Sequence, residues 1–103
     1  LNPESVALMR KDWLTPVQRA DFNKMKTEGI YSYGLGARTR VGGGKAKSPV
    51  GEFGWDGAAG AYCLIDPENA LCAVYMQHVL SHSAAFEFIH PTIRDLIYDG
   101  MNL

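Results

Sequence analysis

The chain has 103 residues, which is enough for one small domain and too few for two. Its 47% hydrophobic content is ordinary for a globular protein and excludes intrinsic disorder. The formal net charge of −1, without a run of like charges, provides no basic surface for nucleic acid or an acidic membrane. No apolar run approaches the ~20 residues that span a bilayer, and no signal peptide is recognisable, so the compartment stays open. Because the first residue is Leu1, we expect a processed chain or a domain cut from a longer one, unless a tag was removed.

Two helices are predicted before residue 30. Asn2–Ser5 offers helix-capping chemistry, with a proline in the first turn, and an irregular apolar pattern continues to Trp13. Thr15 precedes a proline and caps a second helix, which we expect to run through Met25. Gly29 is the expected C-terminal stop of this region.

The middle of the chain is rich in strand-forming residues. Strands are predicted over 30–41, 50–55, 61–65 and 71–76. Gly34 and Gly36 fall two apart, so we expect them to share one strand face and to let another element approach closely. Residues 42–49 have the composition of a loop. Asp66–Asn69 has the residues of a tight turn, so the last two strands form the hairpin that the sequence predicts best.

The last quarter of the chain predicts one further helix. Residues 77–90 show no decisive pattern, but a helix is expected from His90, with Pro91 in its first turn. Its apolar stripe is Ile93, Leu96, Ile97 and Met101. The predicted fold class is therefore α+β. It comprises a small antiparallel sheet of three to four strands, with the N- and C-terminal helices packed on one face, in a single domain over residues 1–103.

Three stretches together resemble the C-terminal end of class C β-lactamase-like serine hydrolases, a group that includes family VIII esterases and penicillin-binding-protein relatives. The stretches are Tyr33-Gly34-Leu35-Gly36, then Gly51-Glu52-Phe53-Gly54-Trp55-Asp56-Gly57-Ala58-Ala59-Gly60, then Ala61-Tyr62 through Ile65-Asp66-Pro67-Glu68. The resemblance covers nearly the whole chain and is tightest from Tyr33 to Met76. It implies a β-lactamase/transpeptidase-like fold, of which this chain is a C-terminal fragment.

The third active-site box of that family is commonly Lys-Thr-Gly, and some members carry Trp-x-Gly, which Trp55-Asp56-Gly57 matches. The resemblance implies that these three residues bind substrate, and that the backbone N–H of Ala58 donates to the oxyanion hole. A glycine lets substrate pass close to the strand. Because Trp55 replaces the lysine that would meet a β-lactam carboxylate, we expect an esterase, peptidase or amidase rather than an efficient β-lactamase. The alternative from the residues alone is an aromatic–glycine pair that packs a sheet corner.

The other two boxes of the family are missing. No serine is followed by lysine at the third position, and no tyrosine by asparagine at the second, so the Ser-x-x-Lys and Tyr-x-Asn boxes are absent. A serine needs an adjacent base to act near neutral pH, so we expect the chain to be inactive alone. Its expected partner is a missing N-terminal part, with which it would act on a small ester, amide or β-lactam. We also expect self-association through an exposed sheet edge. The alternative is a non-catalytic binding or interaction module derived from the same fold.

Other motifs carry little functional weight. His78 and His82 lie four apart without a third ligand, so we expect surface histidines, no metal and no cofactor. A small independent enzyme that uses His78, His82 or His90 lacks a partner nucleophile. Lys45 follows three glycines but is followed by alanine, so the stretch is not a phosphate loop.

The two cysteines fall in the predicted hairpin. If Ile65 pairs with Ala70, Cys63 lies opposite Cys72. The expected spacing is slightly long for a relaxed disulfide, so we expect two reduced residues packed in the sheet.

Overall fold

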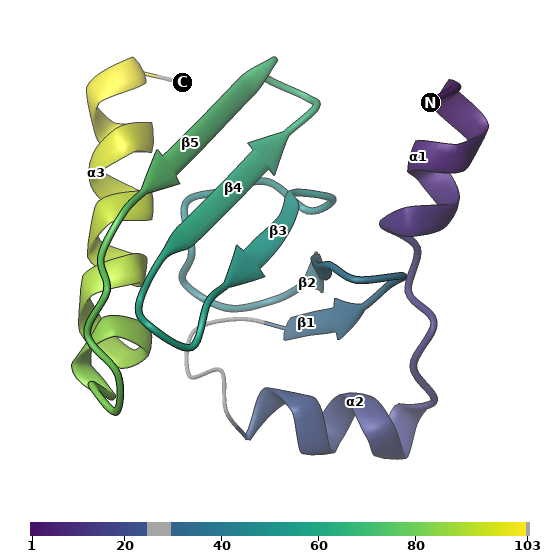
Figure 1. The fold of residues 1–103 in the computed structure, drawn as a ribbon. Coiled ribbons are helices and arrows are strands. Elements are labelled where there is room, and N and C mark those ends of the chain that lie inside the picture. The colour runs from purple at the N-terminus through teal and green to yellow at the C-terminus, as the bar shows by residue number, and fades with distance from the viewer. Residues whose placement is uncertain (25–29, 103) are drawn as a thin grey trace.

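The computed structural model describes residues 1–24 and 30–102. Within them, an antiparallel five-stranded sheet runs in the order β1-β2-β3-β4-β5 (Figure 1). Its strands are β1 (Ile30–Tyr33), β2 (Arg38–Gly42), β3 (Phe53–Asp56), β4 (Tyr62–Asp66) and β5 (Leu71–Tyr75). The helices are α1 (Pro3–Met9), α2 (Pro16–Asn23), the π-helical turn η1 (Ala85–Ile89) and α3 (His90–Met101). None of the described helices is long and apolar enough to cross a membrane. The predicted α+β class is confirmed.

The predicted strand over 30–41 is wrong, because the chain turns in its middle. Gly34 N–H donates to the Ala37 carbonyl across 2.8 Å, and β1 and β2 pair as a hairpin on either side. Gly36 takes a φ of +90°, a conformation that glycine adopts without steric cost. The hairpin accounts for a sheet of five strands instead of three to four. Of Gly34 and Gly36, Gly34 alone permits a close approach, since a Cβ there would lie 2.0 Å from the Met9 carbonyl oxygen.

The first two helices begin at the caps that the sequence predicts. Asn2 Oδ1 accepts from the Ser5 N–H, and Thr15 forms a reciprocal capping box with Gln18. The second helix ends at Asn23, and the predicted extension to Met25 and the stop at Gly29 lie outside the described residues.

The N-terminal region covers the free edge of β1. The Asn23 side chain accepts from the Tyr31 N–H at 2.8 Å and donates to the Tyr31 carbonyl at 2.7 Å. The Trp13 N–H donates to the Tyr33 carbonyl. In contrast, β5 closes the other side of the sheet, and within the described residues no further strand pairs with it. One edge is therefore protected and the other is open.

α3 packs on one face of the sheet, and the Arg10 side chain, which directly follows α1, contacts the other face. Tyr98 of α3 forms the apolar core with Tyr62 and Leu64. Phe53 pairs with Ile65 and therefore points to the opposite face from Leu64, and the guanidinium of Arg10 lies over the Phe53 ring. Figure 1 shows α3 beside β4 and β5, with α1 and α2 at the β1 end.

The buried stripe of α3 also differs from the predicted one. The buried residues are His90, Arg94 and Tyr98, whereas Leu96 and Met101 are exposed. The sheet face beneath α3 carries polar groups, and the Tyr98 hydroxyl donates to Asp66 Oδ2 at 2.6 Å. The helix therefore buries the side chains that can satisfy those groups rather than its most apolar ones.

The β4–β5 hairpin is confirmed, but its register is not the predicted one. Asp66 belongs to β4 and pairs with Leu71, so the turn begins one residue later than expected. Cys63 therefore lies opposite Val74, and Cys72 lies opposite Ile65. Both cysteines are free, and Cys72 is exposed rather than packed in the sheet.

Candidate functional site

The predicted box residues lie where β3 ends and turns into β4. Trp55 pairs with Cys63, and Asp56 pairs with Tyr62. The Gly60 N–H then donates to the Gly57 carbonyl at 2.9 Å, which closes a β-turn with Ala58 at its second position. A Cβ at Gly57 would make only ordinary contacts, the nearest at 3.6 Å, so local packing does not require glycine there.

The Ala58 amide is available to a ligand. Ala58 is exposed, and its backbone N–H donates to no acceptor within the described residues. The N–H of Gly57 is used internally, because it donates to the Ala61 carbonyl at 2.8 Å. An unpaired donor at a surface turn can receive a negatively charged oxygen without first breaking another hydrogen bond.

A cavity of about 610 Å³ lies against this turn. Trp55, Asp56 and Ala58 line it, and Gly57 does not. The other lining residues come from α2 and from the segment after β5: Phe22, Ser81, His82, Ser83, Phe86 and Glu87. The structure thus brings three of the four predicted site residues together at one opening.

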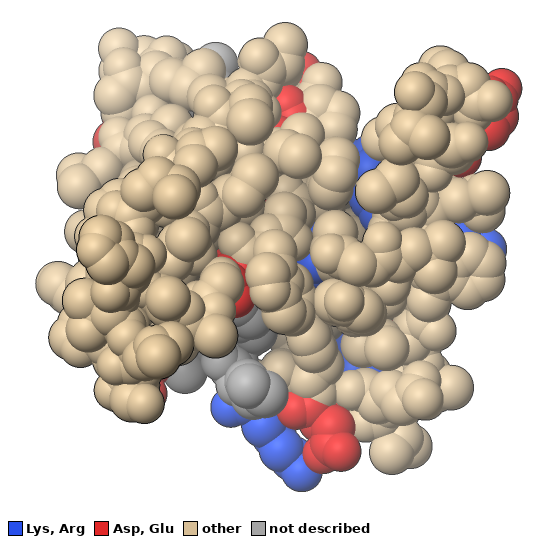
Figure 2. All heavy atoms as spheres, in the orientation of Figure 1, with Lys and Arg blue, Asp and Glu red and all other residues tan. Residues whose placement is uncertain are grey.

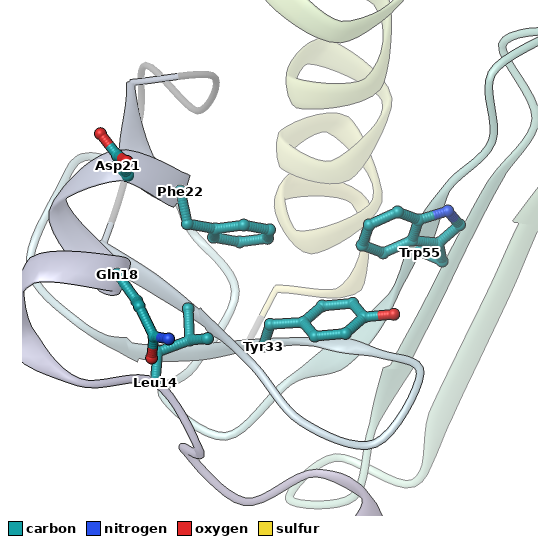
Figure 3. A pocket seen from close by; sticks show the side chains of 6 residues that line it. All are labelled: Leu14, Gln18, Asp21, Phe22, Tyr33 and Trp55. Atoms are coloured by element: carbon teal, nitrogen blue, oxygen red, sulfur yellow. The ribbon is translucent and has the colours of Figure 1, made fainter.

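Aromatic side chains continue this opening into a second hollow of about 520 Å³, which shares Phe22 and Trp55 with the first. Figure 3 shows the rings of Phe22, Tyr33 and Trp55 gathered around one space. Tyr33 stands edge-on to Trp55 at 5.4 Å between centroids and lies 6.0 Å from Phe22. Trp55 remains 44% exposed, so its ring faces the hollow rather than the core.

A buried ion network supports the end of β3. Arg38 Nη1 lies 3.0 Å from Glu52 Oε2, and Arg38 Nε lies 3.2 Å from Asp56 Oδ1. The same guanidinium lies over the rings of Tyr31 and Tyr62, at 5.2 and 5.3 Å from their centroids. Asp56 is therefore held by a structural cation, and the middle residue of the box is not a free base.

The tyrosines beneath the site are held protonated. Burial raises the pKa of Tyr62, with Glu52 adding to the rise and Arg38 opposing it. Burial likewise raises the pKa of Tyr31, whose hydroxyl donates to Glu52 Oε1 at 3.0 Å. Neither phenol is thereby suited to act as the general base that a serine nucleophile requires.

The described residues hold no group of three or more His, Cys, Asp or Glu side chains that could bind a metal ion. His78 and His82 lie in the irregular segment before η1, so helical spacing does not align them. His82 lines the cavity, yet among the described residues no hydrogen bond joins its ring to a serine hydroxyl. A serine–histidine pair is thus not formed within this part of the chain.

Several residues at the site had no sequence signal. Phe22 comes from α2, which is distant in sequence from Trp55, and Phe86 and Glu87 come from the segment without a decisive pattern. Charged residues at alternate positions of a predicted strand, Arg38 and Arg40, were the one available sign of a polar interior.

No family model matches the chain, and no curated protein matches it. Among solved structures, the chain is similar to the LovD6 mutant of simvastatin synthase (LovD) from Aspergillus terreus, with a TM-score of 0.74 and 21% sequence identity. The match covers 97% of this chain and 28% of that one, so this chain spans little more than a quarter of that protein's length. The likeness shows that the chain has the fold of part of a β-lactamase/transpeptidase-like protein.

Proposed function

We propose that this chain is the C-terminal part of a β-lactamase-related serine hydrolase, of the esterase, peptidase or β-lactamase type, and that it is inactive alone. The observation that carries the proposal is the exposed, unpaired N–H of Ala58, which lies in a turn beside a cavity lined by Trp55 and Asp56. In this role Trp55, Asp56 and Gly57 contact the substrate, and Ala58 belongs to the oxyanion hole.

The chemistry would divide between two parts of one protein. A serine of the missing part attacks the carbonyl carbon of an ester or amide, and a base beside that serine takes its proton. The Ala58 N–H donates to the carbonyl oxygen as it becomes negative. The leaving group departs with the proton, and water then hydrolyses the acyl-enzyme. The present chain supplies the oxyanion donor and one wall, and the missing part supplies the nucleophile and its base.

The open side of the sheet is the surface that we assign to the missing part. The outer face of β5 and the segment after it expose Val74, Met76, Val79 and Leu80. Figure 2 shows that the face seen over β4 and β5 carries very few charged side chains. The match to 28% of a longer chain gives a reason for this exposure, since the remainder of such a protein would need a surface to pack against.

Self-association of the isolated chain is a testable consequence. Because β5 offers unpaired backbone groups beside apolar side chains, we expect dimers or larger species by sedimentation at high concentration. Val74→Lys should favour the monomer, since a lysine on an edge strand opposes edge pairing. Val50→Lys is the matched control, because Val50 is 60% exposed against 64% for Val74 and lies outside the sheet. A wild-type chain that stays monomeric would contradict the assignment of this surface.

The cavity wall favours a neutral or cationic substrate over an anionic one. Its described lining includes the exposed Glu87 carboxylate, the Asp56 carboxylate that Arg38 already pairs, and the rings of Phe22, Trp55 and Phe86, without lysine or arginine. A substrate carboxylate would meet like charge, whereas an ammonium group would meet aromatic faces. This argues against β-lactams, which carry a carboxylate, and for uncharged or cationic esters and amides.

Binding of matched small molecules measures this preference. We expect phenyltrimethylammonium to shift the Trp55 indole signal in NMR titrations at concentrations roughly fivefold lower than tert-butylbenzene, its neutral counterpart. Benzoate should be the weakest of the three. Glu87→Gln should reduce the difference between the cationic and neutral ligands without changing the fold, because Glu87 is exposed. Equal or tighter binding of benzoate would exclude this view of the substrate.

The decisive test of the function is the length and activity of the natural protein. Its intact mass and N-terminal peptides should reveal an upstream segment with Ser-x-x-Lys. The longer protein should hydrolyse an activated ester, and the present chain should not. A natural protein that begins near Leu1 would overturn the hydrolase proposal and favour a binding or interaction module that uses the same sheet.

A further inference from the structure

His90 contacts the turn that carries the Ala58 amide. It is the first residue of α3, and its ring is buried with 3% exposure. His90 Nε2 lies 2.6 Å from the carbonyl oxygen of Gly60, the last residue of the turn. A carbonyl oxygen only accepts hydrogen bonds, so Nε2 carries the proton and donates it.

The opposite side of the same ring faces the other end of the turn. His90 Nδ1 lies 3.9 Å from Asp56 Oδ1, which is beyond hydrogen-bond distance but close enough for the carboxylate to act on the ring electrostatically. Asp56 immediately precedes Gly57, and its carboxylate forms an ion pair with Arg38. One side chain from the C-terminal helix thus contacts Gly60, the last residue of the turn, and lies near Asp56, the residue that precedes the turn.

The orientation of the ring is fixed by its surroundings. It stacks on Tyr62 at 4.9 Å between centroids, with 27° between the planes, and meets Tyr75 and Phe86 edge-on at 6.2 and 5.6 Å. The His90 N–H donates to the Ala85 carbonyl, five residues earlier, so the π-helical turn η1 sets the backbone position. Such π-helical turns often occur at functional sites.

We infer that His90 is a positioning residue, which holds the turn 57–60 so that the Ala58 N–H points toward the cavity. The inference rests on the proposed function, because only an oxyanion makes this direction important. An oxyanion donor acts within a narrow distance range, and a misplacement of about 1 Å can lower the rate a hundredfold. The hydrogen bond of 2.6 Å from His90 Nε2 to the Gly60 carbonyl oxygen limits movement of the turn.

Two variants separate the hydrogen bond from the packing of the ring. His90→Phe keeps an aromatic ring against Tyr62 and removes the donor, and His90→Gln restores a donor at similar reach. Tyr98→Phe is the matched control, because it also removes one polar group through which α3 contacts the sheet, the bond to Asp66. It does so away from the turn.

Hydrogen exchange in the present chain and kinetics in the longer protein give independent readouts. Two amides report on the turn: that of Gly60, and that of Val79, which donates to the Ala59 carbonyl. In His90→Phe, we expect both to exchange about tenfold faster relative to the amides of β4. The longer protein should lose about tenfold to a hundredfold in kcat with KM nearly unchanged. His90→Gln should recover both, and Tyr98→Phe should change neither selectively.

The two hypotheses fail differently. Unchanged exchange and unchanged kcat in His90→Phe would overturn the positioning role. A wild-type longer protein without hydrolase activity would instead overturn the proposed function, while the exchange measurement on the chain still decides whether His90 holds the turn.

Discussion

Arg38→Met is expected to lower the free energy of unfolding by about 3–5 kcal/mol, because it removes the guanidinium that pairs with the buried Glu52 carboxylate. Glu52 is fully buried at 0% exposure, and Asp56 contacts the same guanidinium. Removal of one partner of a buried ion pair leaves an uncompensated charge, which costs far more than the pair contributes. Since small domains have about 5–15 kcal/mol of stability in total, a large part of the fold's stability depends on this residue.

Chemical denaturation of the wild-type and Arg38→Met chains measures the difference. Lys47→Met is the control, because its ion pair with Asp99 has side chains that are 48% and 54% exposed, and such pairs contribute about 0–1 kcal/mol. Equal stability losses in the two variants would mean that the Arg38 network is hydrated in solution rather than buried.

The predictable parts of the fold are those that depend on neighbouring residues. The capping residues Asn2 and Thr15 are local chemistry, and the structure confirms them. The expected helix at His90 is also present, but it continues directly from η1 without a side-chain cap. The β1–β2 turn was missed because aromatic and apolar residues continue through it, which is the pattern of an unbroken strand. The pair Gly34 and Gly36 is the local signal of this turn, but two glycines at that spacing are equally typical of a strand that another element approaches closely.

The buried face of α3 shows why apolar periodicity was insufficient. Periodicity locates the face that prefers an apolar environment, but the sheet beneath α3 presents Asp66 and the Arg38 network. Which helix face satisfies those groups depends on strands far away in the sequence. His90, Arg94 and Tyr98 are buried for that reason, and no local pattern marks them.

The candidate site likewise combines residues that are adjacent in the sequence with residues that only the fold brings together. Trp55 to Ala58 are consecutive, so a motif could identify them together. The residues that surround them, Phe22 and Phe86 among them, reach the cavity only through the fold. The function of the turn therefore depends on tertiary contacts that the motif does not contain.

Ala58→Pro is expected to lower kcat/KM of the longer protein by about a hundredfold to a thousandfold while the chain remains folded. Proline removes the N–H that we assign to the oxyanion hole, and one such donor typically contributes this much to the rate. The turn itself tolerates proline, because Ala58 is its second position, where proline is favoured, and its N–H makes no hydrogen bond within the described residues.

A variant at the next residue separates the loss of the Ala58 N–H from a general disturbance of the turn. Ala59→Ser keeps the Ala58 N–H and changes a half-buried neighbour, so we expect nearly normal activity from it. Thermal unfolding should place both variants close to the wild type, which would exclude misfolding as the cause of a lost rate. If Ala58→Pro is folded and fully active, another group holds the oxyanion, and the cavity beside Trp55 then serves substrate binding without contributing to transition-state stabilisation.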